Sequence, residues 1–163
     1  MNKVISIKNA QEITDKIRNE NKTIVVCGGC FDILHIGHIS FLRGAKKQGN
    51  YLFVLLENDK TVRKLKGANR PIHSQKERAE VLAALSFVDY VVLLDEMKSN
   101  DDYDNLMFKL RPDIIAATKN EPQTIHNERQ AKKIGAKVSY VTQRIKNKST
   151  TLLAEIISKN FDK

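Results

Sequence analysis

Short apolar runs alternate along the chain with longer segments that have helical spacing. Residues 51–56 form an unbroken apolar run, Tyr-Leu-Phe-Val-Leu-Leu, whose lack of polar alternation is typical of a parallel strand covered on both faces. Shorter apolar or β-branched runs predict four more strands, at 23–26, 89–94, 113–117 and 137–141.

The segments between these runs carry apolar residues every three or four positions, the period of an amphipathic helix. They predict a leading helix over 7–20 and further helices over 39–47, 101–110, 124–134 and from Ser149 onward. Ser74 and Glu77 have the spacing of a capping box that opens another helix. Gly49 and Gly135 are placed to end helices in left-handed caps. Residues 61–72, with four cations, a glycine and a proline, predict a mobile loop at the sheet edge.

Five strands that alternate with helices predict a Rossmann-like α/β fold. The sheet is expected to be open, parallel, five-stranded and doubly wound, with an extra N-terminal helix. Since 163 residues suit one domain and no internal repeat or low-complexity linker divides them, we expect a single domain over 1–163. Residues 1–22 would hold the leading helix, and 23–163 the α/β core.

Composition places the chain among soluble globular proteins, with 41% hydrophobic and 29% charged residues. No run approaches the ~18 apolar residues of a membrane span, and the first residues lead into no signal-peptide core. We therefore expect a cytoplasmic protein without a membrane partner, in which the two cysteines stay reduced.

The net charge of +9 permits a nucleic acid, a membrane surface or a small polyanion as partner. Basic residues are scattered, with local clusters only at 63–66 and 146–148, and no aromatic residues interleave with them to form a base-stacking platform. Both clusters adjoin predicted phosphate-binding segments, so we expect no specific nucleic-acid partner.

The stretch 29–38, Gly-Cys-Phe-Asp-Ile-Leu-His-Ile-Gly-His, joins the first predicted strand to the helix after it. Such a turn lies at the carboxyl edge of a parallel sheet, where ligands bind and helix-start N–H groups favour an anion. His35 and His38 can share one face of a helical turn, and Gly37 lets a bulky anion approach the backbone. These features predict a polyphosphate site; the alternative is a pair of structural histidines.

Two rival interpretations use the cysteines in the same stretch. Cys27 and Cys30 form a C-x-x-C motif, which after a strand can be a thioredoxin-like redox pair. With His35 and His38 they also supply four zinc-type ligands, although zinc fingers separate their ligand pairs by a longer loop. Neither alternative accounts for Phe31, Asp32 or Gly37.

The pattern Gly-x-Phe-Asp-x-x-His-x-Gly-His resembles the signature of the cytidylyltransferase-like nucleotidyltransferases. That group includes glycerol-3-phosphate and ethanolamine-phosphate cytidylyltransferases. The flanking sequence looks most like the adenylyltransferase domain of ADP-heptose synthase, and the similarity runs from about residue 13 to 157. The segments that carry it are 62–67, 69–72, 77–85, 88–89, 110–113 and 149–151.

The resemblance implies transfer of AMP or CMP from ATP or CTP to a phosphorylated small molecule, such as heptose 1-phosphate, with release of pyrophosphate. It implies in-line attack without a covalent intermediate, Mg²⁺ bound with the nucleotide, and a homodimer. The catalytic residues that it implies are His35, His38, Lys46 and Arg144. The nucleotide-binding residues would be Gly29, Cys30, Phe31, His35, Gly37, His38, Lys64, Lys66, Arg78, Arg144, Ser149 and Thr150. Those expected to contact the acceptor are Asp32, Lys64 and Lys66.

Several of these residues have plainer alternatives. Ser149 and Thr150 open a predicted helix and could form a second anion site, or Ser149 could simply cap that helix. Arg78 could be a surface ion-pair partner, and Asp32 could be a helix cap. Lys64 and Lys66 are expected to close over phosphates from a mobile loop.

One segment departs from the family pattern. Relatives tend to carry a Gly-Asp pair after the fourth predicted core strand, where this chain has Ala-Ala-Thr-Lys-Asn-Glu at 116–121. A long side chain where glycine permits close approach implies an altered acceptor or base pocket. The alternatives are a cytidylyltransferase for a polyol or amino-alcohol phosphate and a non-catalytic, nucleotide-binding regulatory domain.

Overall fold

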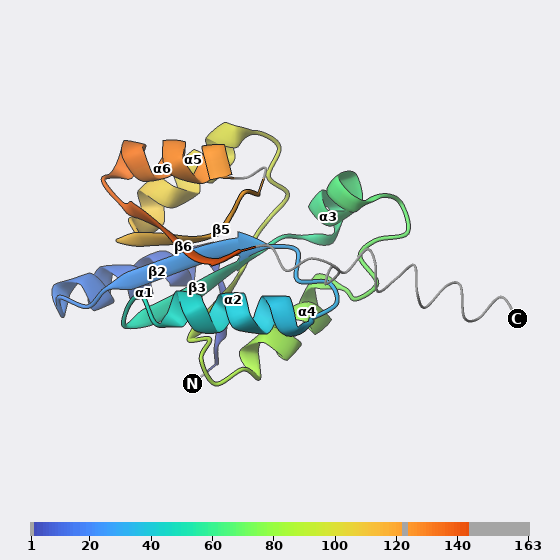
Figure 1. The fold of residues 1–163 in the computed structure, drawn as a ribbon, viewed down its shortest axis with the longest axis horizontal. Helices are drawn as coiled ribbons and strands as arrows, with labels where there is room; N and C mark the ends of the chain where they lie inside the picture. The colour runs from blue at the N-terminus through green and yellow to red at the C-terminus, as the bar shows by residue number, and fades with distance from the viewer. Residues whose placement is uncertain (1, 122–123, 144–163) are drawn as a thin grey trace, which may run out of the picture.

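Six parallel strands form one sheet in the order β1-β4-β3-β2-β5-β6 in the computed structural model, which describes residues 2–121 and 124–143 (Figure 1). The strands are β1 (Val4–Ser6), β2 (Ile24–Gly29), β3 (Tyr51–Leu56), β4 (Tyr90–Leu93), β5 (Ile114–Lys119) and β6 (Lys137–Gln143). The helices are α1 (Ile7–Asn19), α2 (Ile36–Lys46), α3 (Asp59–Lys66), α4 (Gln75–Ala83), α5 (Asn100–Leu110) and α6 (Thr124–Ile134).

The predicted Rossmann-like, doubly wound fold is confirmed, but the prediction of five strands is wrong. The sixth strand is β1, three residues that pair in parallel with β4 through Val4 and Val91. A strand of three residues is too short to show a pattern in the sequence. Consequently α1 is the crossover from β1 to β2 rather than an addition outside the core.

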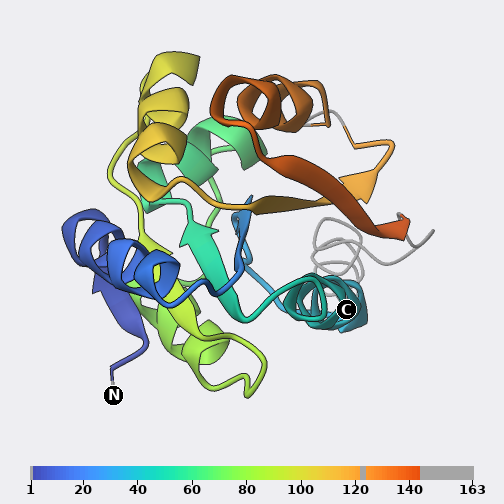
Figure 2. The same cartoon turned by 90° about the vertical axis from the view of Figure 1, so that its left-hand side faces the viewer.

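Helices cover both faces of the sheet, which explains the unbroken apolar strands. One core joins the sheet to α1, α5 and α6 through buried residues such as Ile17 and Leu110. The other joins it to α2 and α4 through Leu42 and Leu82, both fully buried. Figure 2 views the sheet from its amino edge, with these two layers on opposite sides. Burying each such leucine contributes roughly 2 kcal/mol.

The helix α3 stands beyond the strand ends and was not predicted (Figure 1). Its cap is the Asn58 side chain, which accepts a hydrogen bond from the Thr61 amide at 2.8 Å. The predicted mobile loop is therefore wrong for residues 61–66, where lysines and arginine are good helix formers. Gly67, with φ of 102°, ends the helix, and residues 67–74 return the chain to α4.

The predicted helix signals have mixed outcomes. The capping box of Ser74 and Glu77 is present at the start of α4, and Gly135, with φ of 73°, lies directly after α6 as predicted. The cap at Gly49 is wrong, because α2 ends at Lys46 and Gly49 is not left-handed. Instead, a Cβ on Gly49 would lie 2.7 Å from the Val25 side chain, so glycine is needed there for packing.

The helix predicted from Ser149 lies outside the described residues. Within 2–121 and 124–143, none of the helices is long and apolar enough to cross a membrane.

Candidate functional site

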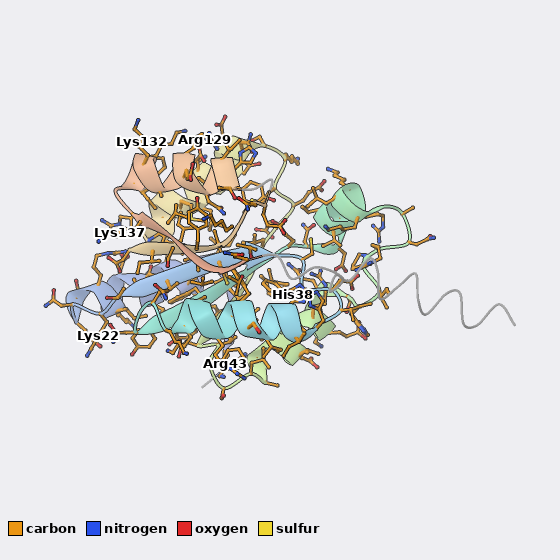
Figure 3. All side chains as sticks on the ribbon, in the orientation of Figure 1. Lys22, His38, Arg43, Arg129, Lys132 and Lys137 are labelled. Atoms are coloured by element: carbon orange, nitrogen blue, oxygen red, sulfur yellow. The ribbon has the colours of Figure 1, made fainter. Side chains whose placement is uncertain are left out.

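The stretch 29–38 lies at the carboxyl edge of the sheet, where β2 ends at Gly29 and α2 begins at Ile36. The strand β2 pairs with β3 on one side and β5 on the other, so the chain order reverses at this point of the sheet. Such a switch point opens a crevice in which doubly wound folds bind ligands. Figure 3 shows His38 at this end of α2, with Lys22 and Lys137 toward the opposite edge.

His35 caps α2 with its own side chain. Its Nδ1 accepts a hydrogen bond from the Gly37 amide at 3.1 Å, so the neutral ring carries its proton on Nε2. The ring stacks on His38, with centroids 3.9 Å apart and planes at 30°. Burial lowers the pKa of His35 below its usual value. The structure thus brings together the two predicted histidines as neutral, stacked rings at a helix start.

His38 is the more buried of the two rings. Its pKa is lowered to about 4, by burial first and then by the charge of His35, against the opposing effect of a hydrogen bond to the Ile33 backbone. Its Nδ1 has no hydrogen-bond partner among the described residues. Phe31 lies against the ring, with centroids 5.3 Å apart. At neutral pH both rings are therefore uncharged, and each carries a single N–H group.

We expect His38 to make stability depend on pH. Unfolded histidine titrates near pH 6.5 and folded His38 near 4, so between these values the unfolded chain binds more protons and stability falls as pH falls. Relative to pH 7, His38 should cost about 2 kcal/mol of unfolding free energy at pH 5. Urea unfolding of wild type and His38→Gln measures this difference. His126→Gln, at an exposed position on α6, is the control; equal pH slopes for wild type and His38→Gln would contradict the expectation.

Phe31 holds an unusual backbone conformation within the turn. It is 5% exposed and has φ of 44°, in the left-handed region that a residue with a bulky side chain rarely adopts. Its ring folds back so far that a Cβ on Gly29 would lie 2.8 Å from it. Gly29 and Phe31 therefore shape the turn, and their predicted nucleotide contacts stay predictions.

Asp32 anchors the loop before α4. Its carboxylate accepts hydrogen bonds from the amides of Ile72 and His73 at 2.9 and 3.1 Å and pairs with Arg70 Nε at 2.5 Å. Burial raises its pKa, but the bonds from His73, Ile72 and Arg70 outweigh burial and lower the pKa overall. The cap alternative is wrong, because His35 caps α2. In this arrangement Asp32 positions the loop, and its contact with an acceptor stays a prediction.

Arg78 is the largest fully buried side chain of the described residues. Its guanidinium donates to the backbone carbonyls of His73, Cys30 and Glu57, and pairs with Asp59 Oδ1 at 2.7 Å. The surface ion-pair alternative is thus wrong. Arg78 thus joins the start of the turn to the end of β3 and to the loop before α4, which is a positioning role. Its nucleotide contact stays a prediction.

Lys46 does not join the site. It lies at the last residue of α2, eight residues after His38, or about 12 Å along the helix axis. Its Nζ pairs with Asp89 and donates to the Asn50 carbonyl, both at 2.6 Å, at the amino edge of the sheet. The prediction of a catalytic Lys46 is corrected: its position along α2 places it at the wrong end.

The two lysines of α3 have different surroundings. Lys64 pairs with Glu96 at 2.6 Å and lines a surface hollow of about 350 Å³ with Lys60, Arg63 and Ala68. Lys66 forms no ion pair with any residue of 2–121 or 124–143. Its positive charge acts on the Cys30 thiol and opposes the rise in pKa that burial causes there. Lys66 is therefore the α3 lysine whose charge reaches the turn.

The cysteines do not support the rival interpretations. Burial raises the pKa of the Cys27 thiol to about 12 and also raises that of Cys30, the opposite of what a reactive thiolate requires. Both thiols are free. Among the described residues, which include Cys27, Cys30, His35 and His38, no three metal-ligating side chains come together to hold a metal ion. Cys30 contributes its carbonyl to Arg78, and its nucleotide contact stays a prediction.

Sequence reasoning missed two polar residues at this edge, Glu57 and Tyr103. Glu57 lies directly after β3 and is 8% exposed, and its Oε1 accepts a hydrogen bond from the Tyr103 hydroxyl at 2.9 Å. An acid placed directly after an unbroken apolar strand was the available signal. Tyr103 lies within the helix predicted over 101–110, where its apolar spacing does not distinguish it from a core residue.

Other predicted residues lie outside the described part of the chain. They are Arg144, Ser149 and Thr150. The departing segment, 116–121, is described: Lys119 is exposed at the end of β5, and Asn120 is left-handed with φ of 63°. Asparagine tolerates this conformation better than most residues, so the turn after β5 keeps a glycine-like backbone without glycine.

Comparison with known proteins agrees with this geometry. Residues 26–159 match the model of the family described as cytidylyltransferase-like. A bifunctional protein HldE from Campylobacter fetus is 51% identical over 100 residues, 61% of this chain and 21% of that protein. A second HldE, from Syntrophotalea carbinolica, is 36% identical over 153 residues, 93% of this chain and 30% of that protein. The chain thus spans less than a third of either relative.

Two solved structures share the fold. A lipopolysaccharide core biosynthesis protein from Thermoplasma volcanium is 27% identical, with a TM-score of 0.60 over 76% of this chain and 97% of that one. A pantoate-beta-alanine ligase from Francisella tularensis is 17% identical, with a TM-score of 0.64 over 98% of this chain and 78% of that one. The second similarity supports the fold alone.

Proposed function

Because this chain belongs to the cytidylyltransferase-like family of nucleotidyltransferases, we propose that it transfers AMP or CMP from an NTP to a sugar phosphate such as heptose 1-phosphate, releasing pyrophosphate. The observation that carries the proposal is the stacked, neutral pair of His35 and His38 at the start of α2. The lipopolysaccharide core biosynthesis protein of similar fold supports a sugar phosphate, since that core is a saccharide.

The transfer replaces one phosphorus–oxygen bond by another. An oxygen of the acceptor phosphate attacks the α-phosphorus, and the bond from that phosphorus to the pyrophosphate oxygen breaks in line with the attack. The attacking oxygen of a phosphate is already ionised, so no general base has to remove a proton. The task left to the protein is to position the two substrates and to stabilise the charge that moves onto pyrophosphate.

The described residues supply that stabilisation at one edge of the sheet. His35 and His38 donate ring N–H groups to phosphate oxygens, and the start of α2 adds the positive end of its dipole. Lys66 adds a full positive charge near Cys30. Asp32 and Arg78 position the turn and its neighbouring loop. Arg144, Ser149 and Thr150 are proposed to hold phosphates as well.

Mg²⁺ is proposed to arrive with the nucleotide. The described residues contain no three metal-ligating side chains close enough together to hold a metal ion. The carboxylates of Asp32 and Asp59 already pair with arginines. Phosphate oxygens and water satisfy most of the octahedral shell of Mg²⁺ in nucleotide complexes. The metal is thus treated as part of the Mg–nucleotide substrate.

Pyrophosphate release tests the proposal. The chain is incubated with Mg–ATP or Mg–CTP and with heptose 1-phosphate, glycerol 3-phosphate or ethanolamine phosphate in turn. The proposal predicts the fastest release with heptose 1-phosphate. Release that is fastest with either alternative acceptor would favour a polyol or amino-alcohol cytidylyltransferase. Nucleotide binding without release on any acceptor would favour a regulatory domain and contradict the proposal.

The lysines of α3 provide a matched pair of variants. Lys66→Ala should raise the KM for the nucleotide and lower kcat, so that kcat/KM falls about 10-fold or more. The reason is that the charge of Lys66 acts where the triphosphate is proposed to bind. Lys64→Ala, which breaks only the pair with Glu96, should stay within about two-fold of wild type, as expected for an exposed ion pair. Steady-state kinetics with varied ATP measures both. Equal losses from the two variants would contradict the assignment of Lys66.

A further inference from the structure

The carboxyl group of Glu57 lies at the same edge of the sheet as the histidines but toward the other helical layer. The Glu57 amide donates to the Gly29 carbonyl at 3.1 Å, which places Glu57 beside the start of the turn. Side chains alternate along a strand: Leu55 packs in the core of α1, α5 and α6, and Leu56 in the core of α2 and α4. Glu57 continues this alternation and meets Tyr103 of α5.

Half of the Glu57 carboxyl group lacks a partner. Tyr103 occupies Oε1, whereas Oε2 is buried and has no hydrogen-bond partner among the described residues. An unpaired buried polar atom is unfavourable, and proteins rarely keep one without a reason. Burial raises the pKa of this carboxyl, and the Tyr103 hydrogen bond and the Arg78 charge oppose the rise. The group is rigidly held and has hydrogen-bonding capacity to spare.

The geometry of in-line transfer indicates which substrate would lie near Glu57. In-line displacement places the acceptor on the side of the α-phosphorus opposite to the leaving pyrophosphate. The histidines mark the α2 side as the triphosphate side. The acceptor would then approach over the strand ends from the side of β3 and α5, where Glu57 and Tyr103 lie.

We propose that Glu57, held in place by Tyr103, binds a hydroxyl group of the acceptor and determines which phosphorylated compound is accepted. This inference rests on the proposed function. A hydroxyl group can donate to or accept from Oε2 whichever protonation state the carboxyl has. An ammonium group fits less well, because two positive charges already act near this carboxyl group. Arg78 donates to the backbone carbonyl of Glu57, and the charge of Lys66 acts on Cys30, a neighbour of Glu57. A hydroxylated sugar phosphate is thus favoured over an amino-alcohol phosphate.

The test removes the polar pair without leaving a new unpaired group. The double variant Glu57→Met/Tyr103→Phe replaces both partners by apolar side chains of similar size, a change that is often neutral for stability. Its control is Glu128→Met/Tyr140→Phe, since Tyr140 donates to Glu128 in the same way on the surface of α6 and β6. Kinetics are measured with ATP and heptose 1-phosphate, each varied in turn.

The site variant should raise the KM for heptose 1-phosphate about 10-fold, the scale of one lost hydrogen bond to a substrate hydroxyl, with the KM for ATP within two-fold. Its preference for heptose 1-phosphate over ethanolamine phosphate should fall by a similar factor. The control should match wild type. If the double variant does not fold, Tyr103→Phe alone, which releases Oε1, should still raise the acceptor KM selectively.

Two failures can be told apart. A wild-type chain that turns over none of the acceptors contradicts the proposed function, and the role of Glu57 falls with it. Turnover by wild type with an unchanged acceptor KM in the site variant overturns the role of Glu57 alone.

Discussion

Replacing His38 with alanine is expected to lower kcat by roughly 10²- to 10³-fold, which corresponds to the loss of one preorganised transition-state donor. His38 is suited to this role because its ring is buried, neutral at pH 7, and stacked on His35. A neutral donor that the fold already holds in place needs no rearrangement when charge develops on the phosphates. The KM for ATP should change much less than kcat.

The control for His38→Ala is His126→Ala, at an exposed position on α6. Circular dichroism should show that both variants stay folded. His38 does not cap α2, so its loss leaves the helix start intact, whereas His35→Ala would remove the cap and mix two effects. A kcat for His38→Ala within about two-fold of wild type would remove His38 from the mechanism.

The second large effect is expected on stability. Arg78→Met should lower the free energy of unfolding by about 3–5 kcal/mol, the range for breaking a buried, hydrogen-bonded ion pair. The change leaves three backbone carbonyls without their donor, those of Cys30, Glu57 and His73. Because these carbonyls hold the turn, β3 and the loop together, activity should fall with stability. Urea unfolding at pH 7 measures the change.

Arg43→Met provides the matched control. Arg43 is exposed on α2, with its guanidinium 5.5 Å from the centre of the Phe87 ring (Figure 3). Loss of an exposed cation–π contact costs about 0.5–1 kcal/mol. A cost of similar size for Arg78→Met would mean that its hydrogen bonds do not organise the edge.

The strands could be predicted because their signal is strong and local. A doubly wound sheet needs apolar strands covered on both faces, and 51–56 and its neighbours show this composition directly. The spacing of His35 and His38 likewise predicted their meeting, since one helical turn brings them together. Features set by the local period of the chain could therefore be inferred from the sequence.

The roles of the long charged side chains could not be inferred in this way. Lys46 and Lys66 carry the same group, but one lies at the far end of α2 and the charge of the other reaches the turn. Arg78 is buried because three distant carbonyls converge on it, at sequence separations of 5, 21 and 48 residues. Its neighbours in the sequence contain no sign of these contacts. The pairing of Asp32 with Arg70 could not be inferred from the sequence for the same reason.

The turn at 29–38 is proposed to support nucleotidyl transfer rather than phosphoryl transfer or binding alone. ATP labelled with ³²P at either the α- or the γ-phosphorus, together with heptose 1-phosphate, distinguishes these possibilities most directly. Nucleotidyl transfer predicts that the α-label enters the sugar product and the γ-label leaves as pyrophosphate, and that His38→Ala suppresses both. Entry of the γ-label into the sugar, or no transfer of either label to heptose 1-phosphate, would contradict it.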